Sequence, residues 1–344
     1  MAKILVTGGT GYIGSHTVVE LQKVGFEVVI VDNLSNSNID VLAGIEKISG
    51  IAPAFENIDC VDYVSMDKMF EKHKDIDAII HFAAFKAVGE SVEKPLMYYR
   101  NNLVSLINLL QLMPIHKVKN FVFSSSCTVY GQPDELPVTE GAPIKFAQSP
   151  YGNTKQIGEE IIRDTIHANS NYQSIILRYF NPIGAHSSAE IGELPNGVPN
   201  NLLPFVTQTA IGLRKQLQVF GNDYNTPDGS CIRDYINVVD LAKAHVIAVQ
   251  RMLNNKTKSN VETFNLGTGT GLSVLEIIET FEKVNGVKIP FKIVPRREGD
   301  VEKVWANPSY ANNELGWTAR ETVEETLRSS WVWEQNLAKR AKTE

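Results

Sequence analysis

Short apolar runs alternate with longer amphipathic segments through the first half of the chain. The apolar runs read KILVTG (3–8), EVVIVD (27–32), DAIIHFAA (77–84), NFVFSSS (120–126) and SIILRYF (174–180). Strands that are covered on both faces have this composition, because neither face meets water. The stretches between the runs, such as PLMYYRNNLVSLINLLQLM, repeat their apolar positions at helical spacing. The pattern predicts an α/β protein with a doubly wound parallel sheet.

The rhythm changes after about residue 180. The segment AHSSAEIGELPNGVPNN is rich in glycine, proline and polar residues, and it is too long for a simple crossover. We therefore expect a first domain over residues 1–180 and a smaller C-terminal α/β region over residues 181–344. Residues 234–253 and 273–286 again have the patterns of strands or helices, so we expect the two parts to be partly interleaved.

A glycine-rich turn joins the first predicted strand to the first predicted helix. Gly8, Gly11 and Gly14 match TGxxGxxG, and Gly9 with the last two also matches GxGxxG. Glycines at this spacing permit a tight turn, let the backbone approach a pyrophosphate, and direct the first amides of the helix at the phosphates. The turn therefore predicts a Rossmann domain that binds a dinucleotide, the alternative being a structural turn without a ligand.

Two aspartates follow the next strands. Asp32 ends the second strand, where a carboxylate accepts hydrogen bonds from a ribose diol and repels a 2′-phosphate, which favours NAD over NADP. Asp59 follows the third strand and is placed either to reach the adenine or to cap a helix.

Composition excludes several other classes of protein. The 344 residues carry a net charge of -6, which offers no electrostatic footprint for nucleic acid. Three cysteines without a CxxC pair fit a reducing compartment better than a disulfide framework. The seven histidines have no metal-binding spacing, so we expect no metal. A signal-like start and a long apolar run are both missing from the sequence, so we expect a cytoplasmic protein without a membrane partner.

Candidate acid/base chemistry lies in SPYGNTK (149–155). Tyr151 is the only one of eleven tyrosines with a lysine four positions later, and on a helix the two side chains share one face. A free phenol titrates near ~10, so we expect Lys155, helped by the positive nicotinamide ring of a cofactor, to lower the pKa of Tyr151. Ser126 ends a strand and is the expected partner of the reacting oxygen. Alternatively, this stretch begins a surface helix and the serines only satisfy backbone groups.

The motifs TGGTGYIGS, SSSCTVYG and YGNTK occur in the order found in the extended short-chain dehydrogenase/reductase family, which this chain resembles. Within that family, the resemblance is to the nucleotide-sugar 4-epimerases and runs almost end to end. The matching segments include DNLSNS (32–37), HFAAFKAVGESVEKPLMYYRNN (81–102), LRYFNPIGAH (177–186), PNNLLPF (199–205), RDYINVVDLA (233–242), FNLGTGTG (264–271) and RREGD (296–300). The resemblance implies interconversion of UDP-glucose and UDP-galactose through a 4-keto sugar, with NAD that stays bound through the cycle.

The resemblance also implies which residues hold the cofactor and the substrate. The implied NAD-binding residues are Gly8, Gly11, Tyr12, Ile13, Gly14, Asp32, Asn33, Asn36, Ser37, Asp59, Cys60, Phe82, Ala83, Lys86, Asn101, Ser126, Tyr151, Lys155 and Phe180. The implied substrate-binding residues are Lys86, Ser126, Thr128, Tyr151, Asn181, Asn201, Arg233, Arg297 and Asp300. The two arginines suit a UDP diphosphate on charge grounds alone, because guanidinium groups bind phosphate oxygens in forked geometry. Tyr151, Lys155 and Ser126 are the implied catalytic residues.

Three rival functions share parts of this pattern. A nucleotide-sugar 4,6-dehydratase starts with the same oxidation but needs a carboxylate at the end of the Ser126 strand, where this chain has Cys127 and Thr128. An alcohol dehydrogenase of the same fold does not account for the long UDP-sugar motifs. A non-catalytic NAD-binding sensor has no need of Tyr151 and Lys155 together. The sequence therefore disfavours all three.

Val304, just before Trp305, occupies a position that lines the sugar pocket in the family and is often tyrosine in bacterial members. We expect the smaller side chain to leave room for an N-acetyl group, so that UDP-GlcNAc and UDP-GalNAc are also interconverted. The resemblance further implies a homodimer that pairs through segments 93–113 and 150–169.

Overall fold

A seven-stranded sheet, parallel throughout, forms the centre of the molecule in a computed structural model that describes residues 1–297 and 299–341. Its strand order is β10-β6-β5-β4-β1-β2-β3. The strands are β1 (Lys3–Thr7), β2 (Glu27–Asp32), β3 (Ala54–Asn57), β4 (Ile76–His81), β5 (Asn120–Ser126), β6 (Gln173–Tyr179) and β10 (Val261–Leu266). The predicted doubly wound α/β fold is confirmed.

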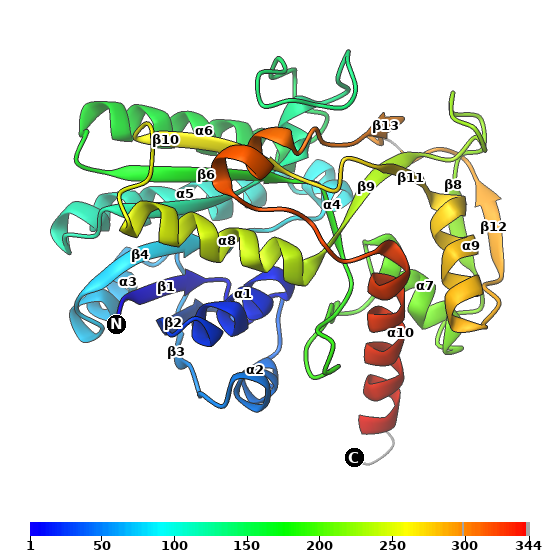
Figure 1. Cartoon of the computed structure of the whole chain (residues 1–344), viewed down its shortest axis with the longest axis horizontal. Coiled ribbons are helices and arrows are strands. Elements are labelled where there is room, and N and C mark those ends of the chain that lie inside the picture. The colour runs from blue at the N-terminus through cyan, green and yellow to red at the C-terminus, as the bar shows by residue number, and fades with distance from the viewer. Residues whose placement is uncertain (298, 342–344) are drawn as a thin grey trace.

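Helices cover both faces of this sheet (Figure 1). On one face α1 (Tyr12–Lys23), α2 (Val41–Ser49) and α8 (Val238–Leu253) bury an aliphatic core against it. On the other face lie α3 (Tyr63–Lys72), α5 (Pro95–Ile115) and α6 (Pro150–Ala168), with the short α4 (Val88–Glu93) before α5. Burial on both sides explains why the strand sequences are almost wholly apolar.

The sequence did not predict β10 as a strand of this sheet. Its sequence, VETFNL, has polar residues among the apolar ones instead of forming an apolar run. Among the described strands, β10 lies at the edge of the sheet next to β6. The polar residues Glu262 and Asn265 are nevertheless buried, because Glu262 accepts hydrogen bonds from Arg251 and Asn265 donates to the Val138 carbonyl. These partnered polar side chains interrupt the apolar run that marks the other strands.

A smaller part of the molecule lies beyond the carboxyl ends of the central strands (Figure 1). It contains β7 (Asn181–Ile183), β9 (Ile232–Asn237), β11 (Gly271–Ser273) and β13 (Lys303–Val304) in one small sheet, and β8 (Leu217–Phe220) with β12 (Phe291–Val294) in another. Its helices are α7 (Leu202–Ala210), α9 (Val274–Asn285) and α10 (Val323–Arg340). Short turns η1 (Cys127–Tyr130) and η2 (Ala311–Leu315) complete the elements.

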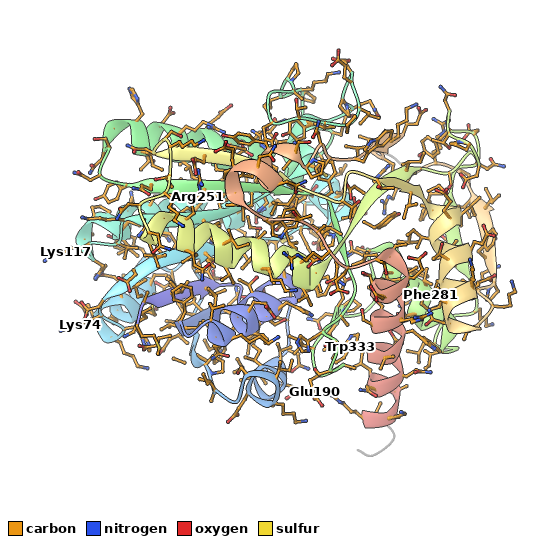
Figure 2. All side chains as sticks on the ribbon, viewed as in Figure 1. Lys74, Lys117, Glu190, Arg251, Phe281 and Trp333 are labelled. Carbon is orange, nitrogen blue, oxygen red and sulfur yellow. The ribbon has the colours of Figure 1, made fainter. Side chains whose placement is uncertain are left out.

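A separate apolar core holds the smaller part together. Phe281 of α9 is fully buried there with Leu203, Val206 and Leu327. Figure 2 places Phe281 and Trp333 on the helices of this part. Between β9 and β11 the chain returns to the central sheet to form α8 and β10, so each part contains residues from the segment after residue 180.

Candidate functional site

The glycine turn forms a cradle that side chains would fill. Gly8 has φ +72°, and a methyl group there would lie 2.7 Å from the Ala83 amide nitrogen. A methyl group on Gly14 would lie 2.2 Å from the Gly8 carbonyl oxygen. Gly11 is the cap of α1 and has no side chain that could accept the first amides of the helix, so these amides stay available for an anion. This geometry fits a dinucleotide pyrophosphate.

Asp32 is placed to organise a ribose site at the end of β2. Its carboxylate accepts hydrogen bonds from the Leu34 amide (2.9 Å), the Ser37 hydroxyl (3.0 Å) and the Thr10 amide (3.2 Å). These contacts fix the orientation of the carboxylate beside the glycine turn, while the side chain itself is almost buried. The carboxylate therefore stands where a ribose diol would be bound in a fold of this kind.

Asp59 does not cap the helix that follows it. The cap of α3 is Asp62, whose carboxylate accepts the Ser65 amide, so the helix-cap alternative for Asp59 is wrong. Asp59 instead accepts a hydrogen bond from the Asn33 side chain at 3.1 Å, which joins the β2 and β3 ends of the cradle. The neighbouring Cys60 thiol is buried in the core beneath, and burial raises its pKa.

The residues that follow β4 lie next to the glycine turn. The amides of Phe82 and Ala83 both donate to the Thr7 carbonyl, at 3.0 and 3.2 Å. Asn101 donates to the side chain of Asn102 at 3.0 Å, and Asn102 in turn donates to the Phe85 carbonyl. These bonds bring the residues that follow β4 and the start of α5 to the same edge of the sheet as the cradle.

Ser126, Tyr151 and Lys155 meet at this edge. Ser126 is the last residue of β5, and Ser149 caps α6 by accepting the Gly152 amide at 3.1 Å, which sets Tyr151 in the first turn. The Lys155 ammonium lies 5.9 Å from the centre of the Tyr151 ring and donates to the Ser124 carbonyl at 2.6 Å. The predicted one-turn spacing thus places a cation beside the phenol.

Burial dominates the pKa values of this pair. Burial raises the pKa of the Tyr151 phenol well above its usual value, although a hydrogen bond with Ser126 opposes the shift. Burial also lowers the pKa of Lys155 to about 8, with Glu159 on the next turn opposing it. In the protein by itself, removal from water thus outweighs the neighbouring charge, and the expectation that Lys155 and the nicotinamide ring together lower the pKa of Tyr151 stays a prediction for the cofactor-bound protein.

The residues after Ser126 cannot serve as a carboxylate pair. Burial raises the pKa of the Cys127 thiol to about 12, so it stays neutral. The buried Thr128 hydroxyl has no hydrogen-bond partner among the described residues, so it is available to bind a ligand. This arrangement lacks the acid that elimination of water requires.

The smaller part brings polar groups to face the same edge. Asn181 starts β7 and Asn201 caps α7. Asp300 holds Arg297 at 2.8 Å and Arg233 at 3.8 Å, so two guanidinium groups lie around one carboxylate. This is a suitable clamp for a diphosphate.

Val304 lies in the wall between the two parts. It is buried together with Val129 and Phe180, and it pairs with Arg233 in the register of β13 and β9. Val304 therefore lies beside Phe180 and Arg233, which the resemblance implies bind the cofactor and the substrate.

Two residues of the site were missed by sequence reasoning. The Phe220 ring lies 5.5 Å from the Arg297 guanidinium and offers a face on which a base could stack. Glu193 lies 3.7 Å from Lys86 and accepts from Asn201. The available signals were weak: Phe220 ends the short segment LQVF, and Glu193 lies in the polar segment after residue 180.

A nucleotide cradle joined to a tyrosine and lysine of one helix, opposite a two-arginine clamp, defines an extended short-chain dehydrogenase/reductase that acts on a nucleotide-sugar. Comparisons with known proteins narrow this class. Residues 5–330 match the family model described as GDP-mannose 4,6 dehydratase. The chain is 52% identical to the UDP-glucose 4-epimerase of Yersinia enterocolitica, with 96% of this chain and 97% of that protein covered.

Two solved structures of UDP-glucose 4-epimerases are also similar to this chain. The UDP-glucose 4-epimerase from Stenotrophomonas maltophila, with bound NAD and formylated UDP-arabinopyranose, is 47% identical with a TM-score of 0.95 and covers 99% of this chain and 100% of its own. The one from Bifidobacterium longum, in complex with NAD+ and UDP, is 46% identical with a TM-score of 0.94 and covers 97% and 98%. The chain belongs to the UDP-glucose 4-epimerase family, as the sequence predicted.

Proposed function

We propose that the protein interconverts UDP-glucose and UDP-galactose by reversible oxidation and reduction at C4, using tightly bound NAD. The observation that carries the proposal is the meeting of Ser126, Tyr151 and Lys155 at the edge of the sheet, between the glycine cradle and the arginine clamp. The family relatives and the ligands in the two solved structures support the same substrates and cofactor.

Different side chains of the site bind the substrate, position it and transfer the proton. Tyr151 takes the O4 proton of the sugar and later returns it, while Ser126 holds O4 by a hydrogen bond. Bound NAD supplies the redox step, in which C4 loses a hydride and regains it on its other face. Arg233 and Arg297 keep the diphosphate fixed while the sugar turns, so the 4-keto sugar stays in the site.

We assign the residues as the resemblance implied. NAD is held by the glycine cradle, by Asp32, Asn33, Asn36, Ser37, Asp59 and Cys60 on the adenosine side, and by Phe82, Ala83, Lys86, Asn101, Ser126, Tyr151, Lys155 and Phe180 near the nicotinamide. The UDP-sugar is held by Lys86, Ser126, Thr128, Tyr151, Asn181, Asn201, Arg233, Arg297 and Asp300. The hydrogen-bonded cradle and the free Thr128 hydroxyl support these assignments. We further assign residues 1–180 mainly to the cofactor and residues 181–344 mainly to the substrate.

The test is to incubate the purified protein with UDP-galactose, without added NAD, and to identify the products by NMR. We expect UDP-glucose, and about one dinucleotide released per chain on denaturation. A parallel incubation with dTDP-glucose separates the rival reaction, since a dehydratase would form a 4-keto-6-deoxy product. Formation of that product, or an empty but fully active preparation, would overturn the proposal.

We propose in addition that N-acetylated UDP-sugars are accepted, because Val304 is small and lies next to Phe180 in the wall of the site. UDP-GalNAc should be converted by the wild type and rejected by Val304→Tyr, while UDP-galactose is still converted. Equal exclusion of UDP-GalNAc by both proteins would refute this assignment.

We propose a homodimer that pairs through α5 and α6. Leu96 is 81% exposed and Met97 and Ile107 are each 36% exposed along α5, which is costly for a helix that faces only water. Light scattering should give twice the chain mass for the wild type and a smaller mass for Leu96→Glu.

We also place the protein in the cytoplasm, which suits three free cysteines. In the part of the chain that the structure describes, no helix is long and apolar enough to cross a membrane.

A further inference from the structure

The carboxylate of Glu193 lies at the junction between the cofactor side and the substrate side of the site. Glu193 belongs to the irregular segment between β7 and α7, and its side chain is only 12% exposed. Its Oε1 atom accepts a hydrogen bond from Asn201 Nδ2 at 2.5 Å and lies 3.7 Å from Lys86 Nζ. The two groups around this carboxylate come from opposite sides of the site.

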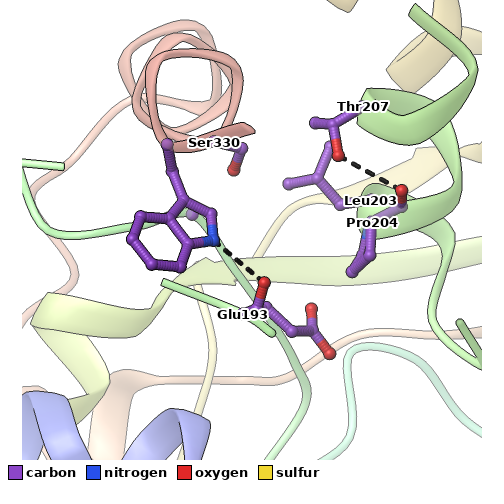
Figure 3. A pocket seen from close by; sticks show the side chains of 7 residues that line it. Glu193, Leu203, Pro204, Thr207 and Ser330 are labelled. Atoms are coloured by element: carbon purple, nitrogen blue, oxygen red, sulfur yellow. Dashed lines mark hydrogen bonds between the residues drawn. The ribbon is translucent and has the colours of Figure 1, made fainter. Parts of the chain in front are cut away.

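The backbone around Glu193 is fixed by contacts of its own. The indole nitrogen of Trp333 donates to the Glu193 carbonyl at 3.0 Å, across the small pocket drawn in Figure 3. A methyl group on Gly192 would lie 2.6 Å from the Trp333 ring, so only glycine allows this approach. At the other end of the segment, the Tyr12 hydroxyl donates to the Gly184 carbonyl at 2.6 Å. The backbone of the segment is therefore held by α10 at Glu193 and by α1 at Gly184.

A contribution to folding stability does not explain why the Glu193 carboxylate is buried at this place. Removing a carboxylate from water is costly unless donors replace the lost hydration. Lys86 is 47% exposed, and ion pairs with so much solvent contact contribute little to stability. Both polar neighbours of the carboxylate are also residues that we assign to ligand binding, which points to a role in the site and not in the core.

We propose that Glu193 is a positioning residue that holds Lys86 and Asn201 in the geometry needed to bind the UDP-sugar against the cofactor. The inference rests on the proposed epimerase function and adds a residue to it. Glu193 accepts from Asn201 and attracts Lys86, so it fixes the distance between the loop after β4 and the start of α7. The charge of Glu193 orients Lys86, while its oxygen orients Asn201.

The variant Glu193→Gln separates these two effects, because glutamine keeps the size and an acceptor oxygen but loses the charge that attracts Lys86. We expect the KM for UDP-galactose to rise about tenfold and kcat to change much less, since a lost charged contact typically weakens binding by about that factor. The dinucleotide content and Tm should stay near those of the wild type. Glu193→Asp keeps the charge and should recover part of the loss.

Glu190→Gln is the matched control. Glu190 lies in the same segment, but its carboxylate pairs with Lys47 of α2 and Arg340 of α10, neither of which we assign to the site. Its removal should leave KM unchanged. If Glu193→Gln has the KM of Glu190→Gln, the positioning role is overturned.

A double variant tests whether Glu193 acts through Lys86. In a Lys86→Met background, Glu193→Gln should raise KM little further, because the partner of the lost charge is already gone. Fully additive effects would overturn the proposal, and so would a Glu193→Asp variant no better than Glu193→Gln. An inactive wild type would instead overturn the proposed function itself, so the two failures are distinguishable.

Discussion

At the scale of single residues, the site buries the Tyr151 phenol and the Lys155 ammonium where the charged form of each is disfavoured. Burial raises the pKa of the Tyr151 phenol and lowers that of the Lys155 ammonium to about 8, so both shifts favour the neutral pair. A phenolate at Tyr151 and an ammonium at Lys155 would stabilise each other in this low-dielectric place. A further positive charge beside Tyr151, which the oxidised nicotinamide carries, would favour the phenolate. We infer that the base becomes active only when the cofactor is oxidised and bound.

Tyr151→Phe removes the hydroxyl and keeps the ring. We expect kcat to fall by about 10²- to 10⁴-fold, the usual contribution of a positioned proton acceptor, with dinucleotide content and UDP binding retained. Steady-state kinetics and calorimetry with UDP would check both parts. Near-normal turnover would remove Tyr151 from the mechanism.

Lys155→Met should make the protein more stable while abolishing turnover. A lysine whose pKa is lowered to about 8 when folded costs stability below that pH, and the cost vanishes as pH rises toward the unfolded value near ~10.4. The pKa shift corresponds to a cost of about 3 kcal/mol in the free energy of unfolding, which the methionine variant avoids. The variant also loses the hydrogen bond to the Ser124 carbonyl, which lowers its stability by about 1 kcal/mol. Urea unfolding of dinucleotide-free protein should show a gain of about 2 kcal/mol at pH 7 that shrinks by pH 9.5. A gain that grows with pH would contradict this account.

At the scale of elements, the turn into α1 and the helix α6 carry the site because their first residues lie at one edge of the sheet. Gly8 and Gly14 make the turn compact by approaching other backbone atoms, whereas Ser149 starts α6 at a defined residue. The site therefore depends on where helices begin more than on where they end.

Gly14→Ala tests the close approach in this turn. The added methyl group would meet the Gly8 carbonyl at 2.2 Å, and backbone cannot yield as a flexible side chain can. We expect loss of bound dinucleotide and a stability cost of about 1–3 kcal/mol. Gly89→Ala, in α4 with open space around it, is the control and should change neither. Dinucleotide release on denaturation and thermal unfolding measure the two effects.

Sequence patterns predicted the strands well where both faces of the strand are covered by apolar side chains. The fully covered strands and the motif-bearing ends of β1, β2 and β5 could be predicted because apolar runs and glycines leave a local signal. β10 lacked an apolar run because its buried Glu262 and Asn265 are hydrogen-bonded to groups outside the strand. Glu193 had only the weak signal of lying in a polar segment, because its partners are brought together by the fold. The burial that raises the pKa of Tyr151 in the protein by itself also left no local signal, since burial depends on residues distant in sequence.

At the scale of the whole molecule, the two parts have separate cores, so damage to one should spare the function of the other. Phe281→Ala removes a fully buried ring from the core of the smaller part and should cost about 3–5 kcal/mol. We expect a higher KM for UDP-galactose with dinucleotide content unchanged. Phe291→Ala, 43% exposed in β12 of the same part, is the control and should behave like the wild type. Loss of dinucleotide from Phe281→Ala would show that the two cores are not independent.

The return of the chain to the central sheet through α8 and β10 has a consequence for how the protein can be divided. A fragment ending at residue 180 would lack the helix that packs on α1 and the edge strand beside β6, leaving Val18, Leu177 and their neighbours open to water. The cofactor-binding half cannot therefore be produced alone by simple truncation. During synthesis it can complete its core only after about residue 266 has left the ribosome, by which time much of the substrate side has been made as well.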